Sequence, residues 1–404
     1  MHPAKAFAGL RTMIIMAKHI SVKGVVQGVG FRPFVYGLAT RLNLHGWVCT
    51  TSSGVEILVE GQNCDLEKFI RSLSLEKPLL ARISSIQVDE APSDPSSSFE
   101  IRESQDEDGA YQPISADIAI CPDCERELFN PKDRRYLYPF INCTHCGPRF
   151  TFIKNVPYDC HNTTLGVFPR CDHCRAEYTD PLDRRFHAQT IACPDCGPVV
   201  ELRETHSQFP ASDPRISSIE LRTSAILKAR RLLREGYIVA IKGTAGFQLA
   251  CDASNPYIVA ELRDRKRCSD KSFTVMAANI TAVTSVCELQ KEEHILLTSR
   301  EKPVVLLVKK NPTYFQAYKV SEMVAPSLNI LRVMLPNTPL HHLLLNQSDP
   351  ILARESAPPM LIMTSSNFGD EPIVTENKDA LQRLSQLVDA FLLHNRDNYM
   401  LSDD

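Results

Sequence analysis

The sequence carries four C-x-x-C pairs in one stretch: CPDC at 121–124, CTHC at 143–146, CDHC at 171–174 and CPDC at 193–196. The stretch is also an internal duplication with an offset of fifty residues. The triplet Asp-Arg-Arg at 133–135 repeats at 183–185, and Cys-Gly-Pro at 146–148 repeats at 196–198. Two copies of one small unit, each with two C-x-x-C turns, therefore organise the middle of the chain.

Eight thiols at this spacing fit two tetrahedral Zn²⁺ sites, because one C-x-x-C turn offers two thiolates and two turns close a site. A closed site is structural and has no open position for catalysis. Each repeat has too few apolar residues for a core of its own, so the metal has to supply folding free energy. The expected ligands are Cys121, Cys124, Cys143, Cys146, Cys171, Cys174, Cys193 and Cys196.

The repeat favours pairing of the cysteines within each half, and a crossed pairing stays open. A disulfide scaffold or a set of reduced buried cysteines is the alternative to zinc, but nothing marks the chain as secreted. His145, Cys160 and His161 lie near the pairs in sequence. Because eight cysteines already fill two sites, we expect these three residues not to be ligands.

The composition is that of a soluble globular protein, with 43% hydrophobic and 23% charged residues. A length of 404 residues predicts two to four domains. The net charge of −3 gives no electrostatic reason to expect nucleic acid, and no apolar run is long enough for a membrane span. Fourteen cysteines in largely metal-type spacing, without a signal peptide, predict a cytoplasmic protein.

A glycine-rich turn, VQGVGFR at 26–32, follows the first predicted strand. Two glycines between a strand and a helix let the backbone curl around an anion, and the helix start directs its N–H groups to the same place. Arg32 adds a fixed cationic fork suited to phosphate oxygens. The predicted order βαββαβ over residues 18–105 is that of a ferredoxin-like unit. A purely structural tight turn is the alternative for the glycines.

The string VQGVGFR resembles the acylphosphatase signature, in the fold order of that family. The resemblance implies a loop that holds an acyl phosphate, with Arg32 clamping the phosphoryl group. The implied phosphate-binding residues are Gln27, Gly28, Val29, Gly30, Phe31 and Arg32. The family also orients the attacking water with the asparagine of G-x-V-x-N. That string reads GWVCT at 46–50, so Thr50 stands at the second catalytic position.

The change to Thr50 matters because a hydroxyl is shorter than a carboxamide and offers a different set of donors and acceptors. Losing a water-positioning group lowers a rate by orders of magnitude and leaves phosphate binding intact. We therefore expect this unit to bind an acyl phosphate and to hydrolyse it poorly.

The Asp-Arg-Arg triplets at 133–135 and 183–185 lie between the two C-x-x-C turns of each repeat. One interpretation is a solvated basic loop with an internal salt bridge. The other is a lining for the path of a phosphate-bearing substrate. The sequence favours neither interpretation.

The last part of the chain alternates predicted helices and buried strands, which indicates an α/β domain with a sizeable sheet. Lys242-Gly243, the basic string around 263–271 and the turn at 364–367 could each be structural, as a solvated helix end or a helix cap. In this order, with Glu371 close behind, they resemble the YrdC-type domain, which makes acyl-adenylates from ATP. The implied nucleotide-binding residues are Lys242, Arg265, Arg267, Lys271, Ser365 and Asn367, and Mg²⁺ is expected with the nucleotide.

The succession of these three modules resembles the HypF family, the carbamoyltransferases of [NiFe]-hydrogenase maturation. The expected organisation is a disordered extension at 1–17, an acylphosphatase-like domain at 18–105, a tandem four-cysteine zinc-finger-like module at 106–203, and a YrdC-like α/β domain at 217–404. The resemblance implies hydrolysis of carbamoyl phosphate, activation of the carbamate as carbamoyl-adenylate, and transfer to a HypE-like acceptor protein during synthesis of the cyanide ligands.

Three departures from the family motivate alternatives. Thr50 replaces the asparagine, and Arg332 replaces a glycine and could strain a positive-φ position or crowd the nucleotide pocket. The family also continues into a transfer domain beyond the end of this sequence, so we expect this chain to lack the transfer step. The first alternative is a non-catalytic fragment that keeps zinc and ligand binding. The second is a threonylcarbamoyl-adenylate synthase acting in tRNA modification.

Overall fold

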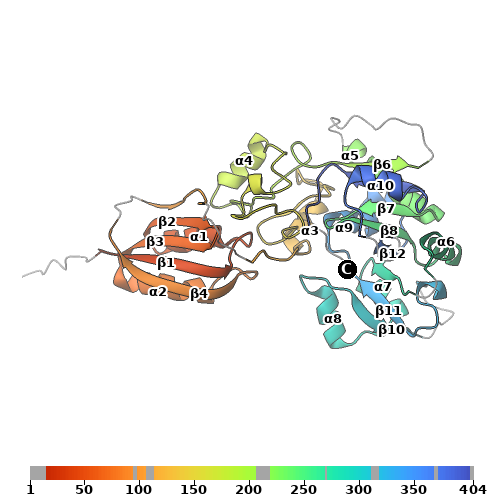
Figure 1. Cartoon of the computed structure of the whole chain (residues 1–404), viewed down its shortest axis with the longest axis horizontal. Coiled ribbons are helices and arrows are strands. Elements are labelled where there is room, and N and C mark those ends of the chain that lie inside the picture. Colours follow the sequence, from red (N-terminus) through yellow and green to blue (C-terminus); the bar gives the residue numbers. More distant parts are fainter. Residues whose placement is uncertain are drawn as a thin grey trace, which may run out of the picture. The chain divides into compact units, whose positions relative to one another are not determined.

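Two units make up the structure, a computed structural model that describes residues 15–93, 98–105, 113–205, 219–268, 271–310, 318–367 and 372–400 (Figure 1). Unit 1 is Met1–Ser115 together with Val156–Asp159, and unit 2 is Ala116–Asn155 with Cys160–Asp404. Within the described residues, no helix has the length and apolar character needed to cross a membrane.

Unit 1 is a five-stranded sheet with the strand order β4-β1-β3-β2-β5. Its elements are β1 (Ile15–Val25), α1 (Phe31–Arg41), β2 (His45–Thr51), β3 (Gly54–Gln62), α2 (Asn63–Leu75), β4 (Arg82–Ala91) and β5 (Phe99–Ile101). Both helices share one apolar core with alternate residues of β1, β2 and β3, so they cover the same face of the sheet. The predicted ferredoxin-like fold is confirmed, and β5 adds a parallel strand beside β2.

Strand β1 begins before the predicted domain boundary. Ile15, Met16 and Ala17 were expected to belong to a disordered extension, but they pair with Gln62, Gly61 and Glu60 of β3. Ala17 is buried, and the ladder hydrogen bonds of a long neighbouring strand extend the sheet to this point. The rest of the predicted extension lies outside the described residues.

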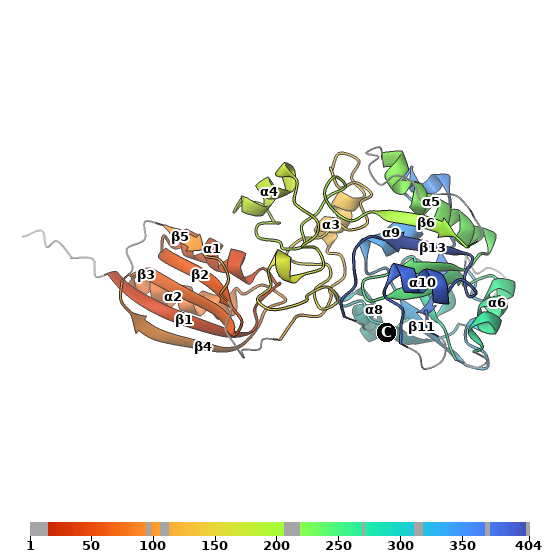
Figure 2. The same ribbon diagram turned by 45° about the horizontal axis from the view of Figure 1, so that its top comes forward.

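Unit 2 contains an eight-stranded mixed sheet with the strand order β10-β11-β9-β12-β8-β7-β13-β6. Its edge strand β6 lies beside β13 (Figure 2). Its strands are β6 (Val200–Glu204), β7 (Val239–Lys242), β8 (Phe247–Asp252), β9 (Thr274–Ala277), β10 (Val305–Val308), β11 (Ile330–Met334), β12 (Met360–Ser365) and β13 (Ala390–His394). Its helices in this part are α5 (Ile219–Glu235), α6 (Pro256–Lys266), α7 (Ile280–Val286), α8 (Lys291–Thr298), α9 (Pro339–Leu345) and α10 (Asn377–Arg383), with short 3₁₀ turns at Glu322–Val324 and Leu352–Arg354.

The sheet has an apolar layer on each face, as the alternation of side chains along a strand requires. One layer packs residues of α6, α7, α8 and α10 on residues such as Ala240 and Val275. The other packs α5 and α9 on the neighbouring strand positions, such as Val239 and Met276. The result is the predicted α/β domain, with helices on both faces.

The two cysteine repeats each contribute one short helix, α3 (Pro122–Leu128) and α4 (Asp172–Thr179), and a 3₁₀ turn, Cys160–Asn162, lies between them. The duplication extends to the backbone, because Leu137 and its equivalent His187 both have φ of 54°. The first repeat shares the apolar core of α5 and α9. The second has only a small core of its own.

Strand β6 was not expected from the sequence. Val200–Arg203 were assigned to the zinc module but pair with β13 as the edge strand of the sheet. The β6 residues are only partly buried and lack a clear apolar run, so a non-local pairing decides their conformation.

Arg332 does not occupy the strained position that was expected. It lies within β11 and pairs with Thr274 of β9 and Leu306 of β10. Its φ is not among the positive values of the described chain, so the backbone here accepts a side chain without strain.

The hydroxyl of Tyr136 ties the first cysteine repeat to the α/β domain. It donates to Asp349 Oδ2 at 2.6 Å, and Asp349 is buried. The repeat-equivalent residue is Phe186, so Tyr136→Phe installs the side chain of the second repeat. Because the buried carboxylate loses a donor, we expect the free energy of unfolding in urea to fall by about 1.5–3 kcal/mol.

Tyr237→Phe is the control, because Tyr237 is 44% exposed. Its free energy of unfolding should stay within about 0.5 kcal/mol of wild type. Equal losses in both variants would contradict a specific role for the Tyr136–Asp349 contact.

Candidate functional site

The glycine-rich turn of unit 1 has the backbone of an anion-binding loop. Gly28 and Gly30 have φ of 66° and 75°, and Gly30 caps α1, which begins at Phe31. The buried side chains of Val29 and Phe31 anchor the turn in the core. These two side chains therefore hold the loop in place. The N–H groups at the start of α1 can then donate hydrogen bonds to an anionic ligand.

Gln27 and Arg32 both bond to a distant segment, Val156–Asp159, that belongs to unit 1. Tyr158 N donates to Gln27 Oε1 at 2.8 Å, and Gln27 Nε2 donates to Thr51 O at 2.8 Å. One amino group of Arg32 donates to Tyr158 O at 3.3 Å and to Asp159 Oδ1 at 3.2 Å. Sequence analysis missed Tyr158 and Asp159, since nothing local marks residues so far along the chain from Arg32.

Thr50 lies on β2, and its side chain is buried. Because side chains alternate along a strand, it shares the helix-covered face with Val48, which belongs to the core. The loop reaches the end of the same strand through the Gln27–Thr51 hydrogen bond. Thr50 is therefore positioned by the strand that adjoins the loop, with a short hydroxyl in place of a carboxamide.

The eight cysteines of the C-x-x-C pairs form two groups, one within each repeat. In each group the four sulfur atoms lie within 4.8 Å of one another. The sulfur–sulfur distances are 3.7 Å for Cys121–Cys143 and 3.8 Å for Cys143–Cys146. A regular ZnS₄ tetrahedron with Zn–S bonds of about 2.3 Å has edges of about 3.8 Å.

The second group has the same dimensions, with 3.7 Å for Cys193–Cys196 and for Cys174–Cys196. These distances are far too long for a disulfide, and all fourteen cysteines are free thiols. Both groups therefore fit a structural zinc ion.

The Asp-Arg-Arg triplets bond to the opposite repeat. Arg134 Nη2 donates to Cys174 Sγ at 3.0 Å and to Glu177 Oε2 at 2.8 Å. Arg184, its equivalent, donates to Cys124 Sγ at 3.2 Å and to Glu127 Oε2 at 2.5 Å. The two repeats thus exchange identical contacts, in the manner of a symmetric dimer.

The second arginine of each triplet crosses in the same way and is buried. Arg135 bonds to Glu177 and to Ala192 O, and Arg185 bonds to Glu127 and to Asn142 O. Burial would raise the pKa of Glu177, but hydrogen bonds from Arg135 and Arg134 outweigh it and lower the pKa to about 2. The triplets are therefore neither solvated loops nor a substrate lining, since they neutralise the thiolate clusters.

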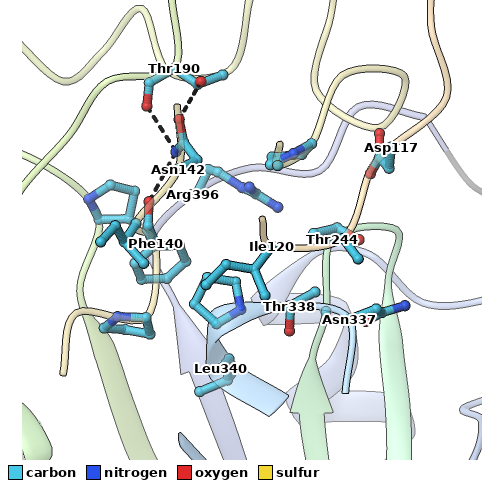
Figure 3. A pocket seen from close by; sticks show the side chains of 18 of the residues that line it. Asp117, Ile120, Phe140, Asn142, Thr190, Thr244, Asn337, Thr338, Leu340 and Arg396 are labelled. Atoms are coloured by element: carbon cyan, nitrogen blue, oxygen red, sulfur yellow. Dashed lines mark hydrogen bonds between the residues drawn. The ribbon is translucent and has the colours of Figure 1, made fainter. Parts of the chain in front are cut away.

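Unit 2 has a cavity of about 90 Å³ between the two cysteine repeats and the α/β domain (Figure 3). Its walls include Ile120, Phe140 and Leu340, and Arg396 extends towards its middle. Arg396 is 4% exposed, and its Nε has no hydrogen-bond partner among the described residues. Burial lowers its pKa to about 10, so it stays charged at neutral pH and suits a small anion.

A second cavity of about 70 Å³ shares Gly243, Thr244 and Thr338 with the first. It is lined by the 243–248 turn, Ser365 and His341. His341 Nδ1 bonds to Asn337 Oδ1 at 2.8 Å, and its buried Nε2 has no partner among the described residues. Burial lowers the pKa of His341 to about 3, so the ring is neutral and presents Nε2 as an acceptor.

Two of the predicted nucleotide-binding residues line the cavities: Lys242 the first cavity and Ser365 the second. Lys242 Nζ donates to the carbonyls of His394 and Arg396, and burial followed by the charge of Arg396 lowers its pKa to about 8. Ser365 Oγ donates to Asn367 Oδ1 at 2.6 Å, so these two predicted residues lie together.

The basic string is divided differently from the expectation. Arg265 pairs with Glu261 and Asp389, and it lines neither cavity. Arg267 and Lys271 are exposed at the end of α6 and beyond it. Lys266 belongs to the basic string but was not among the implied nucleotide-binding residues. It is buried and donates to Ser365 O at 2.5 Å. Glu371 lies outside the described residues.

The crossed arginine contacts predict which zinc site each variant weakens. Arg184→Gln removes donors to Cys124, so we expect the zinc of the first repeat to be lost faster, by about 10- to 100-fold, in a chelator challenge. Arg134→Gln should act on the second repeat in the same way. Mass spectrometry of alkylated peptides, comparing Cys124 with Cys174, reads out each site separately.

Arg126→Gln is the matched control, because Arg126 pairs with exposed Asp123 on α3. It should leave both rates unchanged. Faster loss from the repeat that carries the mutated arginine would contradict the crossed arrangement.

Three protein families match segments of the chain. The acylphosphatase family matches residues 18–101, the HypF finger matches 120–153 and 171–202, and the Sua5–YciO–YrdC family, described as telomere recombination, matches 231–403. An acylphosphatase from Alcanivorax borkumensis is 40% identical over 78 residues, which cover 19% of this chain and 84% of that protein.

Longer relatives match almost the whole chain. Carbamoyltransferase HypF2 from Cupriavidus necator is 46% identical over 392 residues, covering 95% of this chain and 47% of that protein. The crystal structure of full-length HypF in the phosphate- and nucleotide-bound form is 43% identical, with a TM-score of 0.87, over 98% of this chain and 49% of that one. The chain spans about half the length of these relatives. Residues 18–101 thus belong to the acylphosphatase family, and the chain as a whole belongs to the HypF family.

Proposed function

We propose that this chain binds carbamoyl phosphate in unit 1 and uses ATP in unit 2 to form carbamoyl-adenylate, for transfer to a HypE-like acceptor in the synthesis of hydrogenase cyanide ligands. The single observation that carries the proposal is the position of Arg32, at the start of α1 beside two left-handed glycines. Loop N–H groups and one guanidinium suit a phosphoryl group.

In unit 1, the oxygen of a water molecule attacks the phosphorus, the bond from phosphorus to the acyl oxygen breaks, and carbamate, inorganic phosphate and a proton are released. Arg32 and the N–H groups that follow Gly30 hold the phosphoryl oxygens, and Gln27 keeps the loop against β2. Thr50 replaces the water-positioning amide, so this step is the slow one in our proposal.

In unit 2, a carbamate oxygen attacks the α-phosphorus of ATP, the bond to the β-phosphate breaks, and pyrophosphate leaves. Ser365 and Asn367, with Lys266 behind them, and Lys242 at the neighbouring cavity are proposed to contact the nucleotide. Arg267 and Lys271 are proposed to contact the β- and γ-phosphates, which leave as pyrophosphate. Mg²⁺ is proposed to bind the oxygens of these phosphates. The Arg396 cavity is suited to carbamate, an anion much smaller than the nucleotide.

Two zinc ions are proposed to have a structural role, held by the two four-cysteine groups. Eight thiolate ligands and no disulfide fit a reducing compartment, which supports the cytoplasm as the place of action.

The full chain should release pyrophosphate from ATP and Mg²⁺ only when carbamoyl phosphate is added. Ser365→Ala should lower that rate by about 10-fold or more, because a hydrogen bond at the reacting phosphates is lost.

Threonine with bicarbonate, supplied in place of carbamoyl phosphate, tests the synthase alternative and should give no pyrophosphate. Absence of carbamoyl-dependent pyrophosphate, under conditions where a full-length relative is active, would refute the catalytic proposal.

Thr50→Asn tests the alternative of a chain that binds ligand without catalysis. The carboxamide restores a donor and an acceptor at the buried strand position beside the loop, so phosphate release from carbamoyl phosphate should rise by about 10-fold or more. Thr51→Asn, one residue along and on the opposite face of β2, should give no increase. A well-folded Thr50→Asn protein without any gain would place the defect elsewhere.

A further inference from the structure

The segment Val156–Asp159 brings two hydrogen-bond acceptors to the guanidinium group of Arg32. The Tyr158 carbonyl and the Asp159 carboxylate both bond to one amino group of Arg32. The side chains of Arg32 and Asp159 are only 11% and 19% exposed. Both groups therefore lie in contact and largely shielded from solvent at the candidate phosphate site.

This arrangement is an addition to the acylphosphatase fold. The acylphosphatase match ends at residue 101, and the segment comes from between the two cysteine repeats. Tyr158 N is fixed by Gln27, and a Cβ on Gly28 would lie 3.3 Å from the Tyr158 ring. The segment is thus held closely against the phosphate-binding loop, which keeps its acceptors in place.

Acyl phosphates share the phosphoryl group and differ at the acyl end. Carbamoyl phosphate carries an NH₂ group there, whereas acetyl phosphate carries a methyl group. Arg32 and the loop N–H groups donate hydrogen bonds to the phosphoryl oxygens and cannot tell these substrates apart. To select carbamoyl phosphate over acetyl phosphate, the site needs a hydrogen-bond acceptor for the NH₂ group. This acceptor has to lie close to Arg32, because only one carbon and one oxygen separate the amino group from the phosphorus.

We propose that Asp159, supported by the Tyr158 carbonyl, is the specificity-determining residue for the carbamoyl group. Its carboxylate has lone pairs for the bond from Arg32 and for a second bond from the substrate NH₂. Arg32 holds the phosphoryl end, and Asp159 holds the amino end of the same molecule. The inference rests on the proposed binding of carbamoyl phosphate in unit 1.

Two stable analogues test this inference without requiring hydrolysis. Phosphonoacetamide carries the amide NH₂, and acetonylphosphonate replaces it with a methyl group. Calorimetric titration of the full chain should show phosphonoacetamide binding about 10- to 100-fold more tightly, the range expected for a hydrogen bond to a charged group. Asp159→Ala should abolish this preference by weakening phosphonoacetamide alone. Asp159→Asn, which keeps the shape and one acceptor, should leave a smaller preference.

Ser104→Ala is the matched control, because Ser104 Oγ also bonds to Arg32, at 3.2 Å, but carries no charge. It should weaken both analogues by the same factor and keep the preference. If Asp159→Ala does the same, Asp159 only positions Arg32, and the inference is wrong. If Asp159→Ala tightens both analogues and inorganic phosphate, the carboxylate competes with phosphate for Arg32, and the inference is also wrong. Failure of the wild-type chain to bind either analogue would instead refute the proposed function.

Discussion

The middle of this molecule depends on hydrogen bonds that arginines of each cysteine repeat donate to the cysteines and glutamate of the other repeat. Each four-cysteine group concentrates negative charge in a small volume, and burying such charge is costly unless it is paired. Arg134 and Arg184 donate to a cysteine sulfur of the opposite repeat, and each also pairs with the glutamate on that repeat's helix. Each repeat thus receives its compensating cations from the other, so the two are complete only together.

The duplication is symmetric, but its surroundings are not. The first repeat packs into the layer of α5 and α9, whereas the second keeps a small core of its own. Tyr136 bonds to Asp349, and at the equivalent position Phe186 lacks the hydroxyl. The first repeat forms part of the wall of the Arg396 cavity, to which Thr190 and Ala192 of the second repeat also contribute. A metal module whose first role is folding therefore also shapes a candidate ligand site.

The candidate phosphate-binding residues divide between the two units, and each unit presents its hydrogen-bond donors in a different way. In unit 1 the donors come from a left-handed glycine turn and one arginine. In unit 2 they come from side chains at the ends of strands, with Lys242 and Arg396 buried and their pKa values lowered. Buried cations without a paired carboxylate cost stability, and proteins keep them mainly at functional sites.

The sequence by itself determined what is local. C-x-x-C spacing, the glycine turn with Arg32 and the alternation of helices and strands each depend on residues a few positions apart, so their chemistry could be predicted from the order of the amino acids alone. Only the tertiary structure decided which partners these groups meet. The Asp159 contact with Arg32, the crossing of the arginine triplets and the burial of Lys266 against Ser365 join residues that are far apart in the chain. Such pairings follow from how the chain packs, and one sequence carries no local signal for them.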